Sequence, residues 1–332
     1  MPLAFPASIE FVQTSRPGGR RILSCLSGQF SICAAVCLAF SIAGCRSARN
    51  EPVDLSVASA RELSFRGMDA MQQGEWSKAE KLLSKAVNTC ETDVRAHRNY
   101  AETLWQRGET ELAIKHMEEA VRLSDGEPEL LVRVGEMQLA AGQLAQAGRQ
   151  ADAAIRRNRH LASAWALQGD VQLQRGERDE ALANYHRALC YQEHFPRVQL
   201  TVARIYQHTQ RPHRMLATLD SLEDQYPTGQ VPEDVYLLQG IALKALRRPE
   251  QAIETLVAAK EAGKPTADLM YHLGEAYLLV GDRGNARNSL GSALALDTSH
   301  IPSQQLLSRM ENSSGNVSIV LGRQSMSGAS IP

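Results

Sequence analysis

Cysteines and histidines are the side chains of this sequence that could support redox, metal or nucleophilic chemistry. Four of the six cysteines crowd into the first 45 residues, and only Cys90 and Cys190 lie in the body of the chain. The sequence contains no Cys-x-x-Cys pair, and its nine histidines are scattered without a zinc signature. It also contains no phosphate-binding loop and no Gly-x-Ser-x-Gly nucleophile turn. We therefore expect no enzyme activity, no metal site and no cofactor.

Cys45 is the cysteine whose surroundings indicate a specific chemistry. Three arginines, Arg16, Arg20 and Arg21, precede an uncharged, mostly apolar run over 22–44, as in the n-region and h-region of a secretory signal. The run ends in Ile-Ala-Gly-Cys at 42–45, which resembles the bacterial lipobox. The resemblance implies a lipoprotein signal peptide over 1–44, acylation of Cys45 and a lipid-anchored tether over 45–58. Several acyl chains, at ~0.8 kcal/mol per buried methylene, are enough for stable anchoring.

An uncleaved transmembrane anchor is the alternative for the same run, because its length is about the ~20 residues that a span needs. Serines, a glycine and a glutamine dilute its first half, so we favour the lipoprotein. The residue after the cysteine is Arg46 rather than the aspartate that would mark the inner membrane, which slightly favours the outer membrane. We expect the chain in the bacterial cell envelope, lipid-anchored and facing the periplasm. The long stretch before the apolar run also leaves room for a translation start downstream of Met1.

The composition favours a helical protein without affinity for nucleic acid. Aromatic residues make up only 5% of the 332 residues, so the core must come from Ala, Leu, Val and Ile. Alanine and straight-chain residues lose little conformational freedom in a helix, which favours helix over sheet. The formal net charge is -1, from 36 basic and 37 acidic residues. This balance provides no excess of positive charge that would attract a nucleic acid.

The body of the chain repeats itself every 34 residues. Three registers of small residues keep this spacing over four units: Gly74, Gly108, Gly142 and Gly176; Ala79, Ala113, Ala147 and Ala181; and Ala86, Ala120, Ala154 and Ala188. Internal periods of this size are typical of solenoids, in which each repeat is one supersecondary unit.

The fourth unit carries the most complete set of residues, with Trp165, Gly169, Ala181, Tyr185 and Ala188 at fixed positions. This pattern resembles the tetratricopeptide repeat. The resemblance implies that each unit is a pair of antiparallel helices, which cross closely at small residues. The corresponding structural positions are Gly67, Ala79, Ala113, Gly135, Ala147, Gly169, Ala181, Gly240, Ala252, Gly274 and Ala286.

The resemblance extends over 59–300 and predicts an all-α protein, a right-handed superhelical solenoid of about seven such hairpins. The units run over about 60–93, 94–127, 128–161, 162–195, 196–229, 233–266 and 267–300. The fifth is degenerate, and three extra residues follow it. We expect a C-terminal capping helix over 301–311, because the ends of a solenoid need caps. The tail over 312–332 is rich in small and polar residues and is expected to be disordered.

Two different chemistries mark the turn inside the units. Five units place a glycine there. The fifth and sixth units instead have Gln210 and Arg247, and each of these is followed two residues later by a proline, Pro212 or Pro249. Proline at the first position of a helix stops the previous helix and starts the next. We therefore expect the same turn in all seven units.

The resemblance also implies that the first helix of each unit lines a concave groove for a partner. The candidate residues are Arg98, Glu102, Trp105, Glu136, Leu139, Asp170, Leu173, Arg204, Tyr271 and Glu275. The acidic row among them would either bind a basic peptide or form ion pairs between neighbouring repeats, and we favour the ion pairs. Trp105 would either anchor a partner or pack against the next repeat, and we weigh the two equally.

One subfamily of these repeats grips C-terminal carboxylates with lysine and asparagine. The matching positions of the first unit hold Ser64 and Met68, so that function is not transferred. We expect a membrane-tethered scaffold or adaptor that binds protein or peptide partners, as in pilus assembly, secretion or outer-membrane biogenesis. The alternative is a non-catalytic regulatory subunit of a membrane-associated envelope enzyme.

Overall fold

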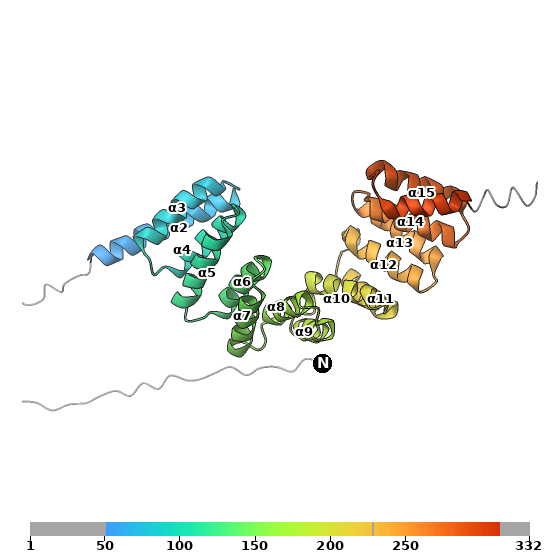
Figure 1. Ribbon diagram of the computed structural model, residues 1–332. Coiled ribbons are helices and arrows are strands. Elements are labelled where there is room, and N and C mark those ends of the chain that lie inside the picture. Colours follow the sequence, from blue (N-terminus) through green and yellow to red (C-terminus); the bar gives the residue numbers. More distant parts are fainter. Residues whose placement is uncertain (1–50, 228, 313–332) are drawn as a thin grey trace, which may run out of the picture. The chain divides into compact units, whose positions relative to one another are not determined.

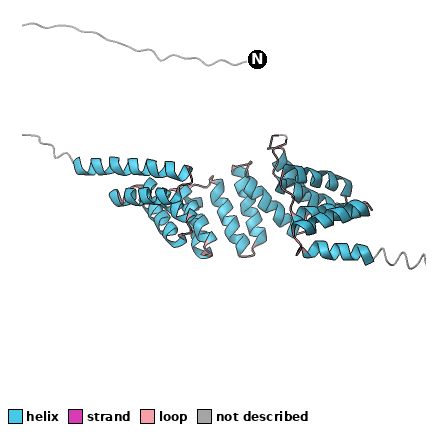
Figure 2. Cartoon of the chain, turned by 90° about the horizontal axis from the view of Figure 1, so that it is seen from above, coloured by secondary structure: helices cyan, strands magenta, loops and turns pink. Residues whose placement is uncertain are grey.

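The computed structural model describes residues 51–227 and 229–312, and the side chains from Val57 onward. All secondary structure in this part of the chain is helical (Figures 1 and 2). The seven predicted hairpins are α2 (Glu51–Gln72) with α3 (Trp76–Thr89), α4 (Val94–Gln106) with α5 (Thr110–Leu123), α6 (Pro128–Ala140) with α7 (Leu144–Arg157), α8 (Ala162–Gln174) with α9 (Arg178–Tyr191), α10 (Pro196–His208) with α11 (Pro212–Glu223), α12 (Glu233–Ala245) with α13 (Pro249–Ala262), and α14 (Ala267–Leu279) with α15 (Arg283–Leu296). A further helix follows over 301–312.

Each hairpin completes its core with its neighbour. Consecutive helices pack together from α3 to α15, and first helices also contact the next first helix, as α6 does with α8 and α12 with α14. The buried cluster around Ala101 of α4 includes Leu130 and Met137 of α6. No unit buries its apolar surface alone, which is the defining property of a solenoid. The all-α solenoid is confirmed, and the right-handed superhelix stays a prediction.

The predicted small residues lie where the helices cross. Alanines at the crossing of the second helix, such as Ala147 and Ala181, are fully buried. A Cβ at Gly169 would lie 2.7 Å from Cε1 of Tyr185, and glycines at the same position of units one, six and seven approach a leucine equally closely. Such distances leave no space for a side chain, so the helices touch backbone to side chain at these points.

Unit three solves the same packing problem in a different way. Its second helix has Ala151 where other units place a bulky residue. The space is filled from the next repeat, because Cδ2 of Leu167 lies 2.5 Å from the position of a Cβ on Gly135. The close approach is therefore preserved while the large side chain comes from another helix.

The turns follow the prediction. The five turn glycines have positive φ values between 73° and 85°, which is the left-handed region. Gln210 and Arg247 adopt the same conformation, with φ values of 53° and 58°. Pro212 and Pro249 are the first residues of α11 and α13. The backbone turn is thus the same in all seven units, although two of them build it without glycine.

The N-terminal boundary of the array differs from the prediction. The tether was expected over 45–58, but α2 already begins at Glu51. Pro52 does not prevent this, because it lies in the first turn, where a backbone N–H has no partner within the helix. The signal peptide over 1–44 and Cys45 itself lie outside the described residues.

The C-terminal helix extends to residue 312 instead of the predicted 311. Its Met310 is buried against Ala286 and Leu290 of α15, and Leu306 and Leu307 pack on the same cluster. This arrangement covers the last hairpin, as predicted for a cap. The predicted tail beyond this helix lies outside the described residues. Within the described part of the chain, no helix is both long and apolar enough to cross a membrane.

Candidate functional site

Ion pairs between neighbouring repeats occupy most of the predicted acidic row. Both carboxylate oxygens of Glu102 on α4 accept hydrogen bonds from Arg133 on α6, at 2.6 and 2.7 Å. Asp170 on α8 accepts from Arg197 on α10 at 2.7 Å. Further along, Arg204 on α10 donates to Asp234 on α12 at 3.1 Å, and Glu275 on α14 accepts from Lys244 on α12 at 2.5 Å.

These four pairs decide between the two interpretations of the acidic row. A carboxylate that already holds a guanidinium or ammonium group offers little attraction to a basic peptide. Glu136 is also occupied, because its Oε2 lies 3.2 Å from Nη1 of Arg133 in the same helix. The favoured interpretation, a ladder of ion pairs between repeats, therefore describes the structure, and exposed pairs of this kind each contribute under ~1 kcal/mol.

The predicted apolar groove residues are half-buried in the repeat cores. Trp105 packs on the hydrophobic cluster that joins units two and three. This is the packing against the next repeat that was one of its two predicted roles. Leu139 and Leu173 lie against the next clusters along the chain. Tyr271 donates its hydroxyl to Oε1 of Glu275 at 3.1 Å and packs near the C-terminal helix. This packing explains all four residues without a partner protein, and a binding role for them stays a prediction.

Lys244 and Glu275 form the most buried of these pairs. The Lys244 side chain is only 9% exposed, and its ammonium group also lies 2.8 Å from Nδ1 of His272. Burial lowers the pKa of Lys244, and the charge of Glu275 opposes this. Burial raises the pKa of Glu275, but hydrogen bonding with His272 and the charge of Lys244 outweigh it and lower the pKa to about 2.

Acidification should therefore weaken the contact between units six and seven. Glu275 has a folded pKa of about 2 against an ordinary value of 4.5, so the unfolded chain binds its proton more readily. The resulting stability is present above about pH 4.5 and is lost as the pH falls towards 2. Denaturant unfolding at pH 5 and pH 2.5 should show a smaller acid-induced loss for Glu275→Gln than for the wild type. The exposed Glu254→Gln is the control, and equal losses in all three proteins would contradict the expectation.

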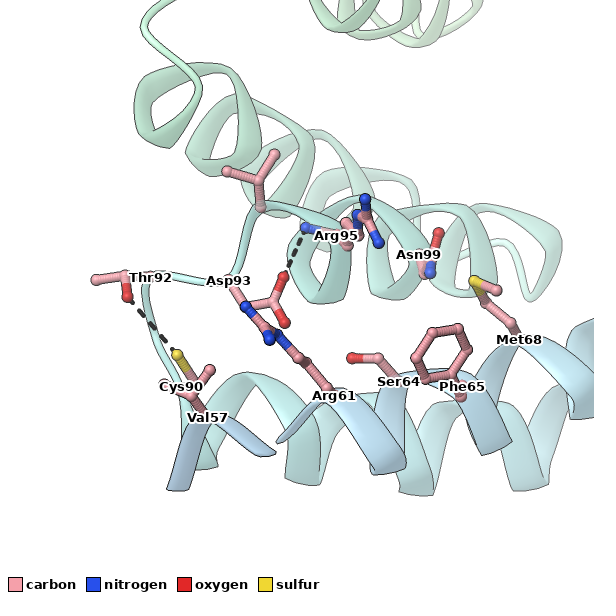
Figure 3. Close-up of a pocket in the computed structure, with 11 residues that line it drawn as sticks. Val57, Arg61, Ser64, Phe65, Met68, Cys90, Thr92, Asp93, Arg95 and Asn99 are labelled. Carbon is pink, nitrogen blue, oxygen red and sulfur yellow. Dashed lines mark hydrogen bonds between the residues drawn. The ribbon is translucent and has the colours of Figure 1, made fainter. Parts of the chain in front are cut away.

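A pocket opens between the first helices of units one and two, where the ladder has no pair among the described side chains (Figure 3). Its volume is about 720 Å³. Phe65 and Met68 of α2 point toward α4 in Figure 3, and Asn99 of α4 lies opposite them. Phe65 is 57% exposed, an unusual fraction for a phenylalanine. We call this feature the N-terminal pocket and define its lining as Val57, Arg61, Ser64, Phe65, Met68, Cys90, Thr92, Asp93, Val94, Arg95 and Asn99.

Two polar groups of the N-terminal pocket are buried without a hydrogen-bond partner. Ser64 is 6% exposed and Asn99 is 5% exposed, and neither Oγ of Ser64 nor Nδ2 of Asn99 has a partner. Leaving such a group unpaired costs about 1–3 kcal/mol. Oδ1 of Asp93, in contrast, has partners, because it caps α4 by accepting from the backbone N–H groups of Arg95 and Ala96. The pocket thus keeps unused hydrogen-bonding capacity that a ligand could satisfy.

Comparison with known proteins agrees with this geometry. A sequence profile of the tetratricopeptide repeat matches residues 66–128 and 237–300. No curated protein matches the chain in sequence.

A tetratricopeptide repeat protein from Parabacteroides merdae has a TM-score of 0.53 at 16% identity, with 76% of this chain and 98% of that chain covered. The C-terminal part of a repeat-containing protein from Cytophaga hutchinsonii has a TM-score of 0.56 at 15% identity, covering 73% of this chain and 98% of its own. PilW, a widely conserved type IV pilus biogenesis factor, has a TM-score of 0.54 at 16% identity, covering 61% and 92%.

The matched stretches include the first two and the last two units, and the hairpins between them share the same turns and crossings. The chain is a tetratricopeptide repeat protein. Tetratricopeptide repeats bind protein or peptide partners, mostly on extended concave surfaces. The fold is therefore that of a protein-interaction scaffold.

Sequence reasoning missed the N-terminal pocket of this tetratricopeptide repeat protein. None of the ten candidate groove residues lines it. Arg98 precedes the lining residue Asn99 in the sequence and is exposed, without an ion pair among the described side chains. Arg61, Phe65 and Asn99 were not singled out. One signal was available, because Arg61 and Arg95 are 34 residues apart and share one repeat position. That register holds Glu129 in unit three and Ser163 in unit four. An arginine returns at this position in unit five, Arg197, but it is paired with Asp170.

Proposed function

We propose that this chain is a membrane-tethered scaffold that binds protein partners in the bacterial cell envelope. The observation that carries the proposal is the N-terminal pocket. It is open, partly apolar and equipped with unpaired polar groups, whereas the rest of the predicted groove is engaged in contacts within the chain. Exposed apolar surface of this kind typically marks a site of protein contact.

The proposed setting is the assembly of an envelope complex such as a pilus, a secretion apparatus or the outer-membrane biogenesis machinery. PilW, which shares the fold, is a type IV pilus biogenesis factor and exemplifies the class. The lipobox-like sequence before Cys45 supports a lipid anchor, with the array facing the periplasm and the outer membrane favoured. Such an anchor would confine the binding surface to the neighbourhood of a membrane.

Chemical cross-linking in intact cells, followed by affinity purification and mass spectrometry, tests the scaffold role. We expect several envelope proteins of one assembly to be captured. Capture of a single membrane-associated enzyme would instead favour a regulatory subunit. If no envelope protein is cross-linked, the proposed function is wrong.

Replacing the predicted lipid-bearing cysteine tests the anchor. Wild-type chain should be recovered with membranes at the mass of a processed, acylated protein. Cys45→Ser should stay at the precursor mass or move to the soluble fraction, because neither cleavage nor acylation can follow. Cys37→Ser is the matched control, since this cysteine lies in the same apolar run but outside the lipobox, and it should behave as the wild type. Unchanged mass and membrane retention in Cys45→Ser would rule out the lipid.

A further inference from the structure

The N-terminal pocket combines positive charge with hydrogen-bond donors that nothing else in the described chain uses. Arg61 and Arg95 line the pocket, are exposed and form no ion pair among the described side chains. Arg98, one helical turn beyond Arg95, is exposed and unpaired in the same sense. The amide nitrogen of Asn99 can only donate, and the hydroxyl of Ser64 is free to donate. A ligand that satisfies these groups must supply acceptor oxygens and negative charge.

The same pocket offers an apolar surface beside these donors. Phe65 and Met68 form one side, and Val57 and Val94 complete it. Phe65 projects from α2 between Ser64 and Met68 and is more than half exposed (Figure 3). A purely ionic ligand would leave this surface uncovered, so the complementary ligand carries a large apolar side chain next to its negative charge.

We propose that the N-terminal pocket binds an internal acidic segment of a partner protein, in which carboxylate side chains flank a large apolar residue. Two guanidinium groups of the lining, those of Arg61 and Arg95, have no ion pair among the described side chains, which favours a segment with two acidic residues over a lone chain terminus. A basic segment would be repelled by the guanidinium groups of Arg61 and Arg95, which outnumber the single carboxylate of the lining, Asp93. This inference rests on the proposed function and names the chemistry of its partner.

Fluorescence anisotropy with matched peptides tests the inference on the full-length chain held in nanodiscs of neutral phospholipid. The probe is a labelled twelve-residue peptide with an amidated C-terminus and Asp-Leu-Glu and Glu-Phe-Asp motifs. We expect it to bind, with an affinity that falls as salt is added. Three control peptides replace the acidic residues by Asn and Gln, the acidic residues by Lys, or the apolar residues by Ser. Each should bind at least tenfold more weakly than the acidic peptide.

Two variants locate the binding at the pocket. Arg95→Gln should weaken the acidic peptide about tenfold, the loss expected for one charge-assisted hydrogen bond. The control is Arg149→Gln on α7, which removes an exposed arginine that has no ion pair among the described residues and should change nothing. Ser64→Ala should weaken binding while leaving the thermal unfolding midpoint unchanged or raised, because its hydroxyl has no partner to lose. A merely structural serine would instead lower the midpoint.

Equal binding of the acidic, amide and basic peptides would overturn the inference, as would an acidic peptide that binds Arg95→Gln and the wild type alike. Binding only by peptides with a free C-terminal carboxylate would overturn it too. The inference can fail by itself: if no acidic peptide binds but intact-cell cross-linking still captures envelope proteins, the scaffold stands and its partner chemistry is different. If cross-linking also captures none, the proposed function falls with it.

Discussion

Gly240→Ala is expected to destabilise the contact between α12 and α13 by about 1–3 kcal/mol, the cost of overpacking a close helix crossing. A Cβ at this position would lie 2.5 Å from Cγ of Leu256 and 2.6 Å from its Cδ2. Because Cγ is the branch point of the leucine and not its flexible end, the two helices must separate. Alanine is the better helix former by about 1 kcal/mol, so local propensity and packing oppose each other at this residue. We expect packing to prevail.

The matched control is Gly291→Ala in α15. This glycine is exposed, and a Cβ there would meet no atom within 4 Å. The same substitution should therefore stabilise the protein by about 0.5–1 kcal/mol. Native-state hydrogen exchange gives the readout unit by unit, which suits a solenoid whose stability is a sum of local terms. Faster exchange in α12 and α13 of Gly240→Ala, with no change in units two and three, is the expected pattern. Slower exchange in α12 would show that the crossing does not need glycine.

Lys244→Met should be the most damaging single change in the ladder, at about 2–3 kcal/mol. It leaves the carboxylate of Glu275 half-buried and without its cation. Arg204→Met removes a pair in which both side chains are 56% exposed, and should cost less than about 1 kcal/mol. The double variant Lys244→Met with Glu275→Leu should recover much of the loss, because an apolar pair of similar volume can replace a buried ion pair. Denaturant unfolding of the four proteins compares them directly, and equal losses for Lys244→Met and Arg204→Met would contradict this ranking.

The sequence was most informative where the backbone dictates the residue type. Turn residues and crossing residues are constrained by positive φ values and by helix separation, so glycine, proline and alanine at fixed spacing predicted seven hairpins within a few residues. The start of α2 was predicted too late, because Pro52 and the polar residues around it indicated an unstructured tether. In unit three, Leu167 of the next unit packs on Gly135 in place of a bulky residue at position 151. A pattern that treats each unit separately could not predict this replacement.

The candidate site was harder to predict, because it depends on which side chains meet across repeats. A row of carboxylates at one repeat position is compatible with an acidic groove and with a ladder of ion pairs. To choose between them one must know whether basic side chains of the neighbouring repeats contact the carboxylates, as Arg133, Arg197 and Lys244 do. The N-terminal pocket lies where α2 and α4 share no ion pair among the side chains from Val57 onward. Such an absence has no residue signature. The sequence shows only two arginines at the same position of units one and two, Arg61 and Arg95, and these stand out only when the charged residues of the other repeats are known to be paired.

Site-specific photo-cross-linking in intact cells tests the central claim, that the N-terminal pocket is where this scaffold binds its partner. A photoreactive phenylalanine analogue would replace Phe65, and in a second strain the exposed Leu112 on α5. The account predicts discrete protein adducts from position 65 that are strongly reduced by Arg95→Gln, and few or none from position 112. Equal adducts from both positions, or none from position 65 in a protein that remains folded, would contradict it.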